Sequence, residues 1–225
     1  IPFGTKYLFC DPVSSACIGT DICEDLWVPD KPSTHACLAG ANIIVNPSAS
    51  DEVIGKQDYR RMMVLQQSSS CYCAYLYCSA AMDESSTDLV FSGHSMIAEN
   101  GKLLKDVIFP KVPCVITSLI DLETIEYNRM HQSTYPNKGD YAYIDVCVSS
   151  VGQKKEIKAA ELVTILQKEN YSISRNPFVP ADDEERWKRC HRILQIQAHG
   201  LATRVRHTGI KNLVIGISGG LDSTL

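Results

Sequence analysis

The sequence lacks long hydrophobic runs: no segment approaches the ~20 consecutive apolar residues that a membrane-spanning helix needs. Of its 225 residues 44% are hydrophobic, which is ordinary for a globular protein with a buried core. Positive charge is not in excess either, because 22 Lys and Arg stand against 26 Asp and Glu, and no basic stripe occurs. We therefore expect neither a membrane nor a nucleic acid as a partner.

The first residues of the sequence are not expected to form a secretory signal peptide. Ile1-Pro2-Phe3-Gly4 has no starting methionine and no basic segment followed by an apolar run. We expect the chain to be a piece of a longer protein, cut at both ends.

Cysteine is abundant, but the spacing of a metal site is absent. There are ten cysteines and no Cys-x-x-Cys pair, and His35, His94 and His131 are isolated from other ligand types, so a metal site has little support. Most of the cysteines lie in apolar, strand-like runs, where a thiol acts as a small hydrophobic group. We expect reduced core thiols in a cytoplasmic protein rather than a disulfide framework.

Strand and helix signals alternate over the first 120 residues. Strands are predicted over 17–22, 42–45, 71–80 and 112–119, and helices over 33–38, with Ser33 as the N-cap, and 56–69. Asn100-Gly101 separates two strand-like segments, 95–99 and 102–105, which predicts a β-hairpin. This mixture predicts a layered α/β fold with an antiparallel component.

The rest of the chain is divided by a linker-like segment. A strand is predicted within 141–148 and a helix over 155–169, and residues 172–180 carry two prolines typical of a linker. A further helix follows, with Asp182 or Asp183 as its N-cap. We place a domain boundary near Phe178 and predict a last strand over 212–217.

A glycine-rich loop follows that last predicted strand. Its sequence is Ser218-Gly219-Gly220-Leu221-Asp222-Ser223-Thr224. Adjacent glycines let the backbone approach a ligand closely, and a turn leading into a helix offers N–H groups to a phosphate. Asp222 would suit such a site only with a divalent cation between the negative charges. The loop does not fit the pattern G-x-x-x-x-G-K-[ST], because it has no lysine.

A second motif lies near the start, at Asp21-Ile22-Cys23-Glu24-Asp25-Leu26-Trp27. A cysteine at the exit of a strand is placed like a nucleophile, and a thiolate attacks an amide carbonyl if a base and oxyanion donors assist it. From spacing alone, Cys23 is also compatible with a core thiol. Glu24 and Asp25 are equally compatible with capping of the next turn.

Together the motifs resemble the glutamine-dependent NAD synthetases. The first resembles the I-C-E-D-x-W signature of their nitrilase-type glutaminase domain, and the loop resembles the S-G-G-x-D-S pyrophosphate loop of N-type ATP pyrophosphatases. Segments 38–42, 46–50, 55–56, 87–97 and 176–180 match in the same order. The resemblance implies part of a nitrilase-like αββα layered domain (1–150), a connecting segment (151–180) and the beginning of a Rossmann-like ATP pyrophosphatase domain (181–225).

The resemblance also implies site residues and chemistry. Cys23 would hydrolyse glutamine, with Glu24, Ser50 and Lys56 binding that substrate. The ammonia would amidate deamido-NAD with release of AMP and pyrophosphate, in a homo-oligomeric full protein that uses ATP and magnesium. The ATP-binding residues would be Gly216, Ile217, Ser218, Gly219, Gly220, Leu221, Asp222 and Ser223, with Asp222 also holding the metal.

One departure leaves alternatives open. In the resembled family the Glu and Lys of the Glu-Lys-Cys site lie upstream of the cysteine, and only 22 residues precede Cys23. We therefore expect the isolated chain to be an inactive fragment. A nitrilase-type amidohydrolase, another amidotransferase, and a non-catalytic remnant or interaction fragment are the other readings.

Overall fold

The computed structural model describes residues 3–81, 89–110, 112–136, 138–146, 158–169, 171, 176 and 179–224. The chain divides into two compact units, Ile1–Tyr171 and Ser172–Leu225. Each unit is described by itself. The three-part division at residues 150 and 180 stays a prediction.

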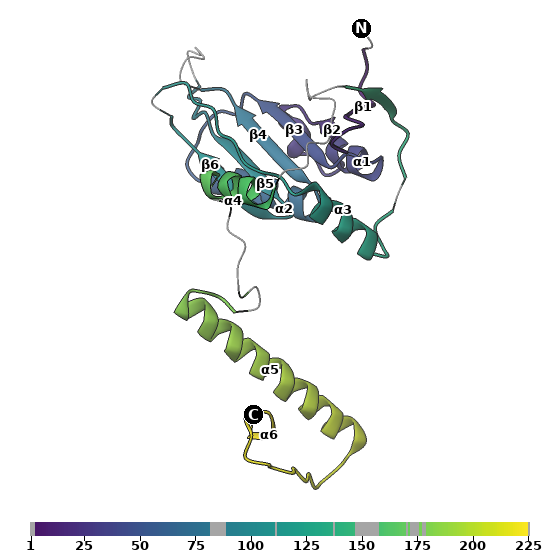
Figure 1. Cartoon of the computed structure of the whole chain (residues 1–225), viewed down its shortest axis with the longest axis vertical. Coiled ribbons are helices and arrows are strands. Elements are labelled where there is room, and N and C mark those ends of the chain that lie inside the picture. Colours follow the sequence, from purple (N-terminus) through teal and green to yellow (C-terminus); the bar gives the residue numbers. More distant parts are fainter. Residues whose placement is uncertain are drawn as a thin grey trace. The chain divides into compact units, whose positions relative to one another are not determined.

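A seven-stranded mixed sheet forms the centre of the first unit (Figure 1). Its order is β6-β5-β4-β3-β2-β1-β7. Strands β2, β3 and β4 run parallel, β7 runs parallel to β1, and the pairs β1–β2, β4–β5 and β5–β6 are antiparallel. The predicted α/β fold with an antiparallel component is therefore confirmed. The strands are β1 Tyr7–Cys10, β2 Cys17–Thr20, β3 Ile43–Ser48, β4 Ala74–Ser79, β5 Ser95–Glu99, β6 Lys102–Val107 and β7 Ala142–Asp145.

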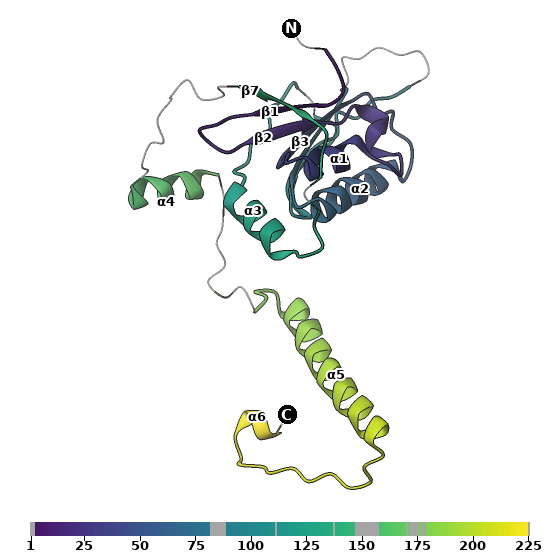
Figure 2. The same cartoon turned by 90° about the vertical axis from the view of Figure 1, so that its right-hand side faces the viewer.

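Two helices, α1 (Pro32–Leu38) and α2 (Lys56–Ser70), lie on one face of this sheet (Figure 2). The contact between α1 and β2 is close, because a Cβ atom at Gly19 would lie 2.8 Å from the Cβ of Ala36. On α2 the buried residues are spaced by three and four, at Arg60, Met63, Val64 and Gln67, which is the period of one helix face. The core therefore lies between these helices and the sheet.

A third helix, α3 (Leu122–His131), is hydrogen-bonded near the N-terminal ends of β3 and β4. Arg129 donates from Nε to the carbonyl oxygen of Tyr72 at 3.0 Å, and from one Nη to those of Ala41 at 2.6 Å and Cys71 at 3.0 Å. These carbonyls lie two or three residues before the first residues of β3 and β4, so one guanidinium satisfies three acceptors near the start of two strands. Helix α4 (Ala159–Lys168) follows later in the chain.

Several predicted elements form with small shifts, and two details are wrong. The hairpin forms as predicted, with Asn100 at φ 49° and Gly101 at φ 80°, a turn that requires the left-handed region twice. Ser33 is not the cap of α1: the helix begins at Pro32, and the Ser33 N–H is donated to Asp21 instead. Residues 112–119 form no strand; Val115 there is 89% exposed, so this apolar run has no packing partner to order it.

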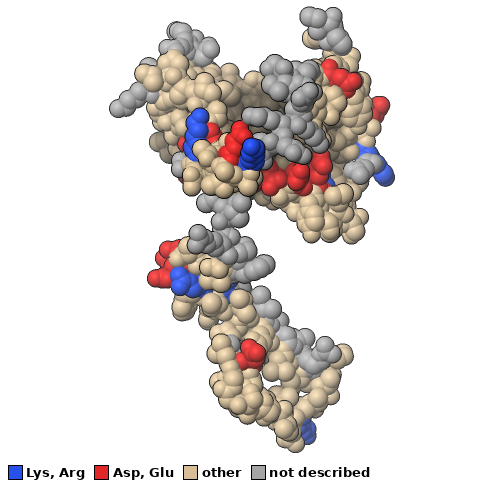
Figure 3. Space-filling model, in the orientation of Figure 1, with Lys and Arg blue, Asp and Glu red and all other residues tan. Residues whose placement is uncertain are grey.

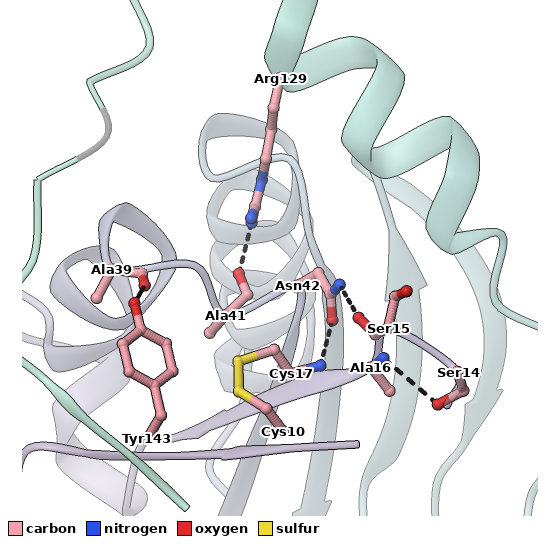
Figure 4. The surroundings of a disulfide bond; sticks show 10 residues. All are labelled: Cys10, Ser14, Ser15, Ala16, Cys17, Ala39, Ala41, Asn42, Arg129 and Tyr143. Atoms are coloured by element: carbon pink, nitrogen blue, oxygen red, sulfur yellow. Dashed lines mark hydrogen bonds between the residues drawn. A yellow bond between two sulfur atoms is a disulfide. The ribbon is translucent and has the colours of Figure 1, made fainter. Parts of the chain in front are cut away.

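The expectation of reduced cysteines is wrong for one pair. Cys10 and Cys17 face each other on the antiparallel strands β1 and β2 and form a disulfide (Figure 4). Beside them Asn42 accepts the Cys17 N–H at 2.8 Å and donates to the carbonyl of Ser15 at 2.9 Å. Direct cross-strand pairing brings the two sulfurs together. The separation of seven residues in the sequence did not by itself predict this disulfide. Cys37, Cys71 and Cys73 are buried and free.

The second unit contains α5 (Asp183–Thr208) and a four-residue helix, α6 (Leu221–Thr224). Asp182 caps α5, accepting the Glu185 N–H at 2.8 Å, which confirms one of the two predicted caps. The strand predicted over 212–217 does not form, and Val214 is 97% exposed. The described residues of this unit contain no other strand with which an extended segment could share hydrogen bonds.

The surface carries both signs of charge. On the face drawn in Figure 3, acidic and basic side chains lie near one another in each unit. Of the helices in the described residues, none combines the length and the apolar character needed to cross a membrane.

Candidate active site

The candidate site lies where the parallel strands β2, β3 and β4 end. The carboxyl ends of parallel neighbours meet at one edge of a sheet, so the residues after β2 and β3 come together there. Cys23 follows β2, and Ser50 follows β3. Helix α2 begins nearby with Lys56. Because β5 runs antiparallel to β4, its start at Ser95 also lies at this edge.

Cys23 occupies a strained backbone position at this edge. Its φ is 51°, in the left-handed region that residues other than glycine and asparagine rarely adopt. Cys23 is also the first residue of a 3-10 helix, η1 (Cys23–Leu26). The thiol is half-buried and free. Among the described residues, none makes a hydrogen bond to its sulfur. The turn therefore presents the Cys23 thiol just beyond the end of a strand.

A buried polar network holds this turn. Asn46 on β3 accepts the Cys23 N–H through Oδ1 at 3.0 Å, and its Nδ2 donates to the Tyr75 hydroxyl at 3.0 Å. Tyr75 donates in turn to Asp21 Oδ2 at 2.7 Å. The other oxygen of Asp21 accepts the Ser33 N–H at 2.7 Å. The chain of bonds links the ends of β2, β3 and α1 behind the cysteine, and every link is satisfied.

The electrostatics of this network follow from its burial. Asp21 is fully buried, and the loss of hydration raises its pKa, although hydrogen bonds from Ser33 and Tyr75 act against the rise. Burial, followed by the nearby Asp21 carboxylate, raises the pKa of Tyr75 above its ordinary range. Tyr75 therefore stays protonated and remains a donor to Asp21.

The predicted glutamine-binding residues lie at the same edge. Ser50 is buried, and its N–H donates to the Ser79 hydroxyl at 3.2 Å. Lys56 pairs with Asp51, and this hydrogen bond holds the pKa of the Asp51 carboxyl below its usual value. The Lys56 ammonium also lies 5.5 Å from the ring centroid of Trp27, the residue that ends η1. Trp27 thus joins the cysteine turn to the start of α2.

Glu24 and Asp25 differ in their contacts. Asp25 caps η1, because its Oδ2 accepts the Ile22 N–H at 2.8 Å. Capping was the simpler of the two readings of these acidic residues. The Glu24 side chain is exposed, and its predicted contact with glutamine stays a prediction.

A second buried network, beside Ser50, was not predicted from the sequence. Arg60 on α2 is fully buried and donates to Glu52 at 3.0 Å and to His94 at 2.9 Å. His94, interpreted as isolated, also bonds Asp106 on β6 at 2.8 Å. The spacing of four residues from Arg60 to Val64 was the one available signal that Arg60 shares the buried face.

The glycine-rich loop is fully described but exposed. Gly219 has φ 85°, and Asp222 lies in the short α6. The Ser218 N–H donates to the Ser223 hydroxyl at 3.1 Å, and the Gly220 N–H donates to the Ser218 hydroxyl at 3.3 Å. Two amides of the turn are thus engaged within the loop itself, and its binding of ATP and magnesium stays a prediction. Across the part of the chain that is described, no group of three or more His, Cys, Asp or Glu residues is arranged to hold a metal ion.

No family model matches the chain. The glutamine-dependent NAD(+) synthetase of Mycobacterium tuberculosis is 34% identical over 227 aligned residues, which cover 100% of this chain and 33% of that protein. The chain thus spans about a third of the length of the curated relatives it matches.

Two solved structures resemble parts of the chain. One is a glutamine-dependent NAD(+) synthetase from Cytophaga hutchinsonii, with a TM-score of 0.37 and 31% identity, covering 45% of this chain and 15% of that one. Another is a carbon-nitrogen hydrolase from Helicobacter pylori G27, with a TM-score of 0.45 and 18% identity, covering 59% of this chain and 49% of that one. With TM-scores below 0.5, these two structures carry no argument, and the relationship rests on the sequence similarity. Over its whole length, the chain is homologous to about one third of a glutamine-dependent NAD(+) synthetase.

Proposed function

We propose that this chain carries the glutamine-hydrolysing cysteine of a glutamine-dependent NAD(+) synthetase. The observation that supports this best is the similarity of this whole chain to about a third of such an enzyme, together with a cysteine on a left-handed turn after a strand. In this proposal Cys23 is the nucleophile, and Glu24, Ser50 and Lys56 bind the substrate glutamine.

The chemistry at Cys23 is amide cleavage through a thioester. The sulfur, after loss of its proton, attacks the side-chain carbonyl carbon of glutamine, and a carbon–sulfur bond forms. The carbon–nitrogen bond then breaks, and the nitrogen leaves as ammonia after gaining a proton. Water hydrolyses the thioester to glutamate and frees the thiol. The resemblance places the base and the oxyanion-side lysine in sequence upstream of the cysteine.

The use of the ammonia belongs to the same proposal. Ammonia would amidate deamido-NAD after its carboxylate has been activated by ATP, with AMP and pyrophosphate released. Residues Gly216–Ser223 would hold the phosphates of ATP, and Asp222 would hold magnesium. Bound ATP and magnesium supply the activation and the charge neutralisation.

The test uses the protein expressed from its complete open reading frame. NAD formation is measured with glutamine and, separately, with ammonium as the nitrogen source. Cys23→Ala should abolish the glutamine-driven reaction and leave the ammonium-driven reaction intact. Loss of both reactions in a folded variant would contradict the assigned role of Cys23. Ammonia release from glutamine with no NAD formed from either source would instead indicate a simple amidohydrolase.

A further inference from the structure

A buried Arg–His pair lies directly behind the predicted glutamine-binding residues. Arg60 is in the first turns of α2, and its side chain is 0% exposed. One Nη donates to the Ser50 hydroxyl and to the carbonyl oxygen of Asp51, each at 3.3 Å. Burying a guanidinium is costly unless its donors are satisfied. Both Nη groups of Arg60 are hydrogen-bonded, whereas its buried Nε has no partner among the described residues.

The other Nη of Arg60 is fixed by groups on two further elements. It donates to Glu52 at 3.0 Å and to His94 Nδ1 at 2.9 Å. Glu52 also accepts the Ser92 hydroxyl at 2.6 Å. Burial alone would raise the pKa of Glu52, but the bonds from Ser92 and Arg60 outweigh it and lower that pKa. Glu52 is therefore ionised and anchors the guanidinium.

The protonation state of His94 follows from its partners. Arginine has no acceptor, so Nδ1 of His94 accepts from Arg60 and carries no proton. Nε2 therefore carries the proton and donates it to Asp106 at 2.8 Å. Asp106 is held by Arg61, whose nearer Nη lies 2.6 Å away. His94 is thus a neutral link between β6 and α2.

We propose that Arg60 and His94 are positioning residues that hold Ser50 and Lys56 in the geometry for binding glutamine. Arg60 fixes the hydroxyl of Ser50 and the backbone of Asp51, and the Asp51 carboxylate in turn pairs with Lys56. His94 fixes the direction of Arg60. The inference rests on the proposed function, because it assigns the pair to the same glutamine site.

The geometry gives the pair a pH dependence. A proton on Nδ1 of His94 would face Arg60, so that hydrogen bond would be lost and two positive charges would lie side by side, with Arg61 close by. Asp106 and Glu52 are the negative groups that face the ring from β6 and from the segment after β3. Burial lowers the pKa of His94 below its ordinary value of about 6.5, and Asp106 offsets this only in part. The arrangement should therefore fail as the pH falls below that range.

The experiment measures the KM and kcat for glutamine by ammonia release, using the protein from its complete open reading frame. Arg60→Met should raise the KM about tenfold or more, since a hydrogen bond from a charged donor to Ser50 is lost, with a smaller change in kcat. Arg129→Met is the matched control, because Arg129 also donates to part-buried carbonyl oxygens, at the opposite ends of β3 and β4. It should lower the melting temperature and leave the KM unchanged.

His94→Gln keeps the proposal testable if Arg60→Met does not fold. Glutamine can accept from Arg60 and donate to Asp106, and it does not titrate. The wild-type KM should rise as the pH falls below the ordinary histidine pKa of about 6.5, while the His94→Gln variant should show no such rise. His35→Gln, at an exposed histidine paired with Asp30, should behave as the wild type does.

The outcomes separate the two proposals. An unchanged KM in folded Arg60→Met, or the same acid rise in His94→Gln as in the wild type, would overturn the positioning role while glutamine hydrolysis stands. A wild-type protein that releases no ammonia from glutamine would overturn the proposed function and this inference with it.

Discussion

Removing the side chain of Asn46 tests whether the polar network holds the cysteine turn. In Asn46→Ala the Cys23 N–H loses its acceptor and the Tyr75 hydroxyl loses its donor. Asn46 is 1% exposed, so water cannot easily replace it. Each buried group left without a partner costs about 1–3 kcal/mol. The Cys23 N–H is only partly buried, so we expect a total loss of about 2–4 kcal/mol in unfolding free energy.

The expected result has two parts, one thermodynamic and one local. Urea unfolding should show the loss of stability. The rate at which Cys23 is alkylated in the native chain should also change, because its φ of 51° is no longer enforced. This rate is measured from the mass of the peptide that contains Cys23. Asn42→Ala is the matched control. Asn42 is also buried and joins the Cys17 N–H to the Ser15 carbonyl, away from the turn. Equal stability losses with an unchanged Cys23 rate in both variants would refute the role of Asn46.

Three further perturbations test the fold and its charges. Gly19→Ala should cost about 1–3 kcal/mol by urea unfolding, because the added methyl meets Ala36 at 2.8 Å; an unchanged midpoint would show that α1 is not packed this closely. Cys17→Ser should cost about 2 kcal/mol more under oxidising conditions than under reducing ones; equal losses in both would deny the disulfide a role. The stability of Asp21→Asn relative to the wild type should increase as the pH rises from about 4 to about 7. Because folding raises the pKa of Asp21 above 3.8, this carboxyl stabilises the wild type most at pH values below 3.8, and that stabilisation is lost as the pH rises through the folded-state pKa. A constant difference over that range would contradict the raised pKa.

The elements that local patterns specify were predictable from the sequence. Asn100-Gly101 demands the left-handed turn that the hairpin shows, and Asp182 caps α5 as its side chain allows. Cys23 was predicted at a strand exit, and it lies three residues after the end of β2 at Thr20. Such features depend on a few neighbouring residues, so the sequence carries them in full.

The rest depends on contacts between distant residues. The run 212–217 is apolar and strand-like, but a strand needs a partner, and none exists in the described part of its unit. Arg60 and His94 are 34 residues apart, and nothing near either one in sequence shows that they pair inside the core. The disulfide likewise required knowing that Cys10 and Cys17 are opposite each other on adjacent strands.

The central claim is that Cys23 is the residue that takes the glutamyl group from glutamine. The most direct measurement incubates the protein from its complete open reading frame with isotope-labelled glutamine, quenches it in acid, and determines the masses of its cysteine peptides. The account predicts a labelled thioester on the peptide that contains Cys23 and on no other. Label on a different cysteine, or glutamine hydrolysis with full activity in Cys23→Ala, would contradict it.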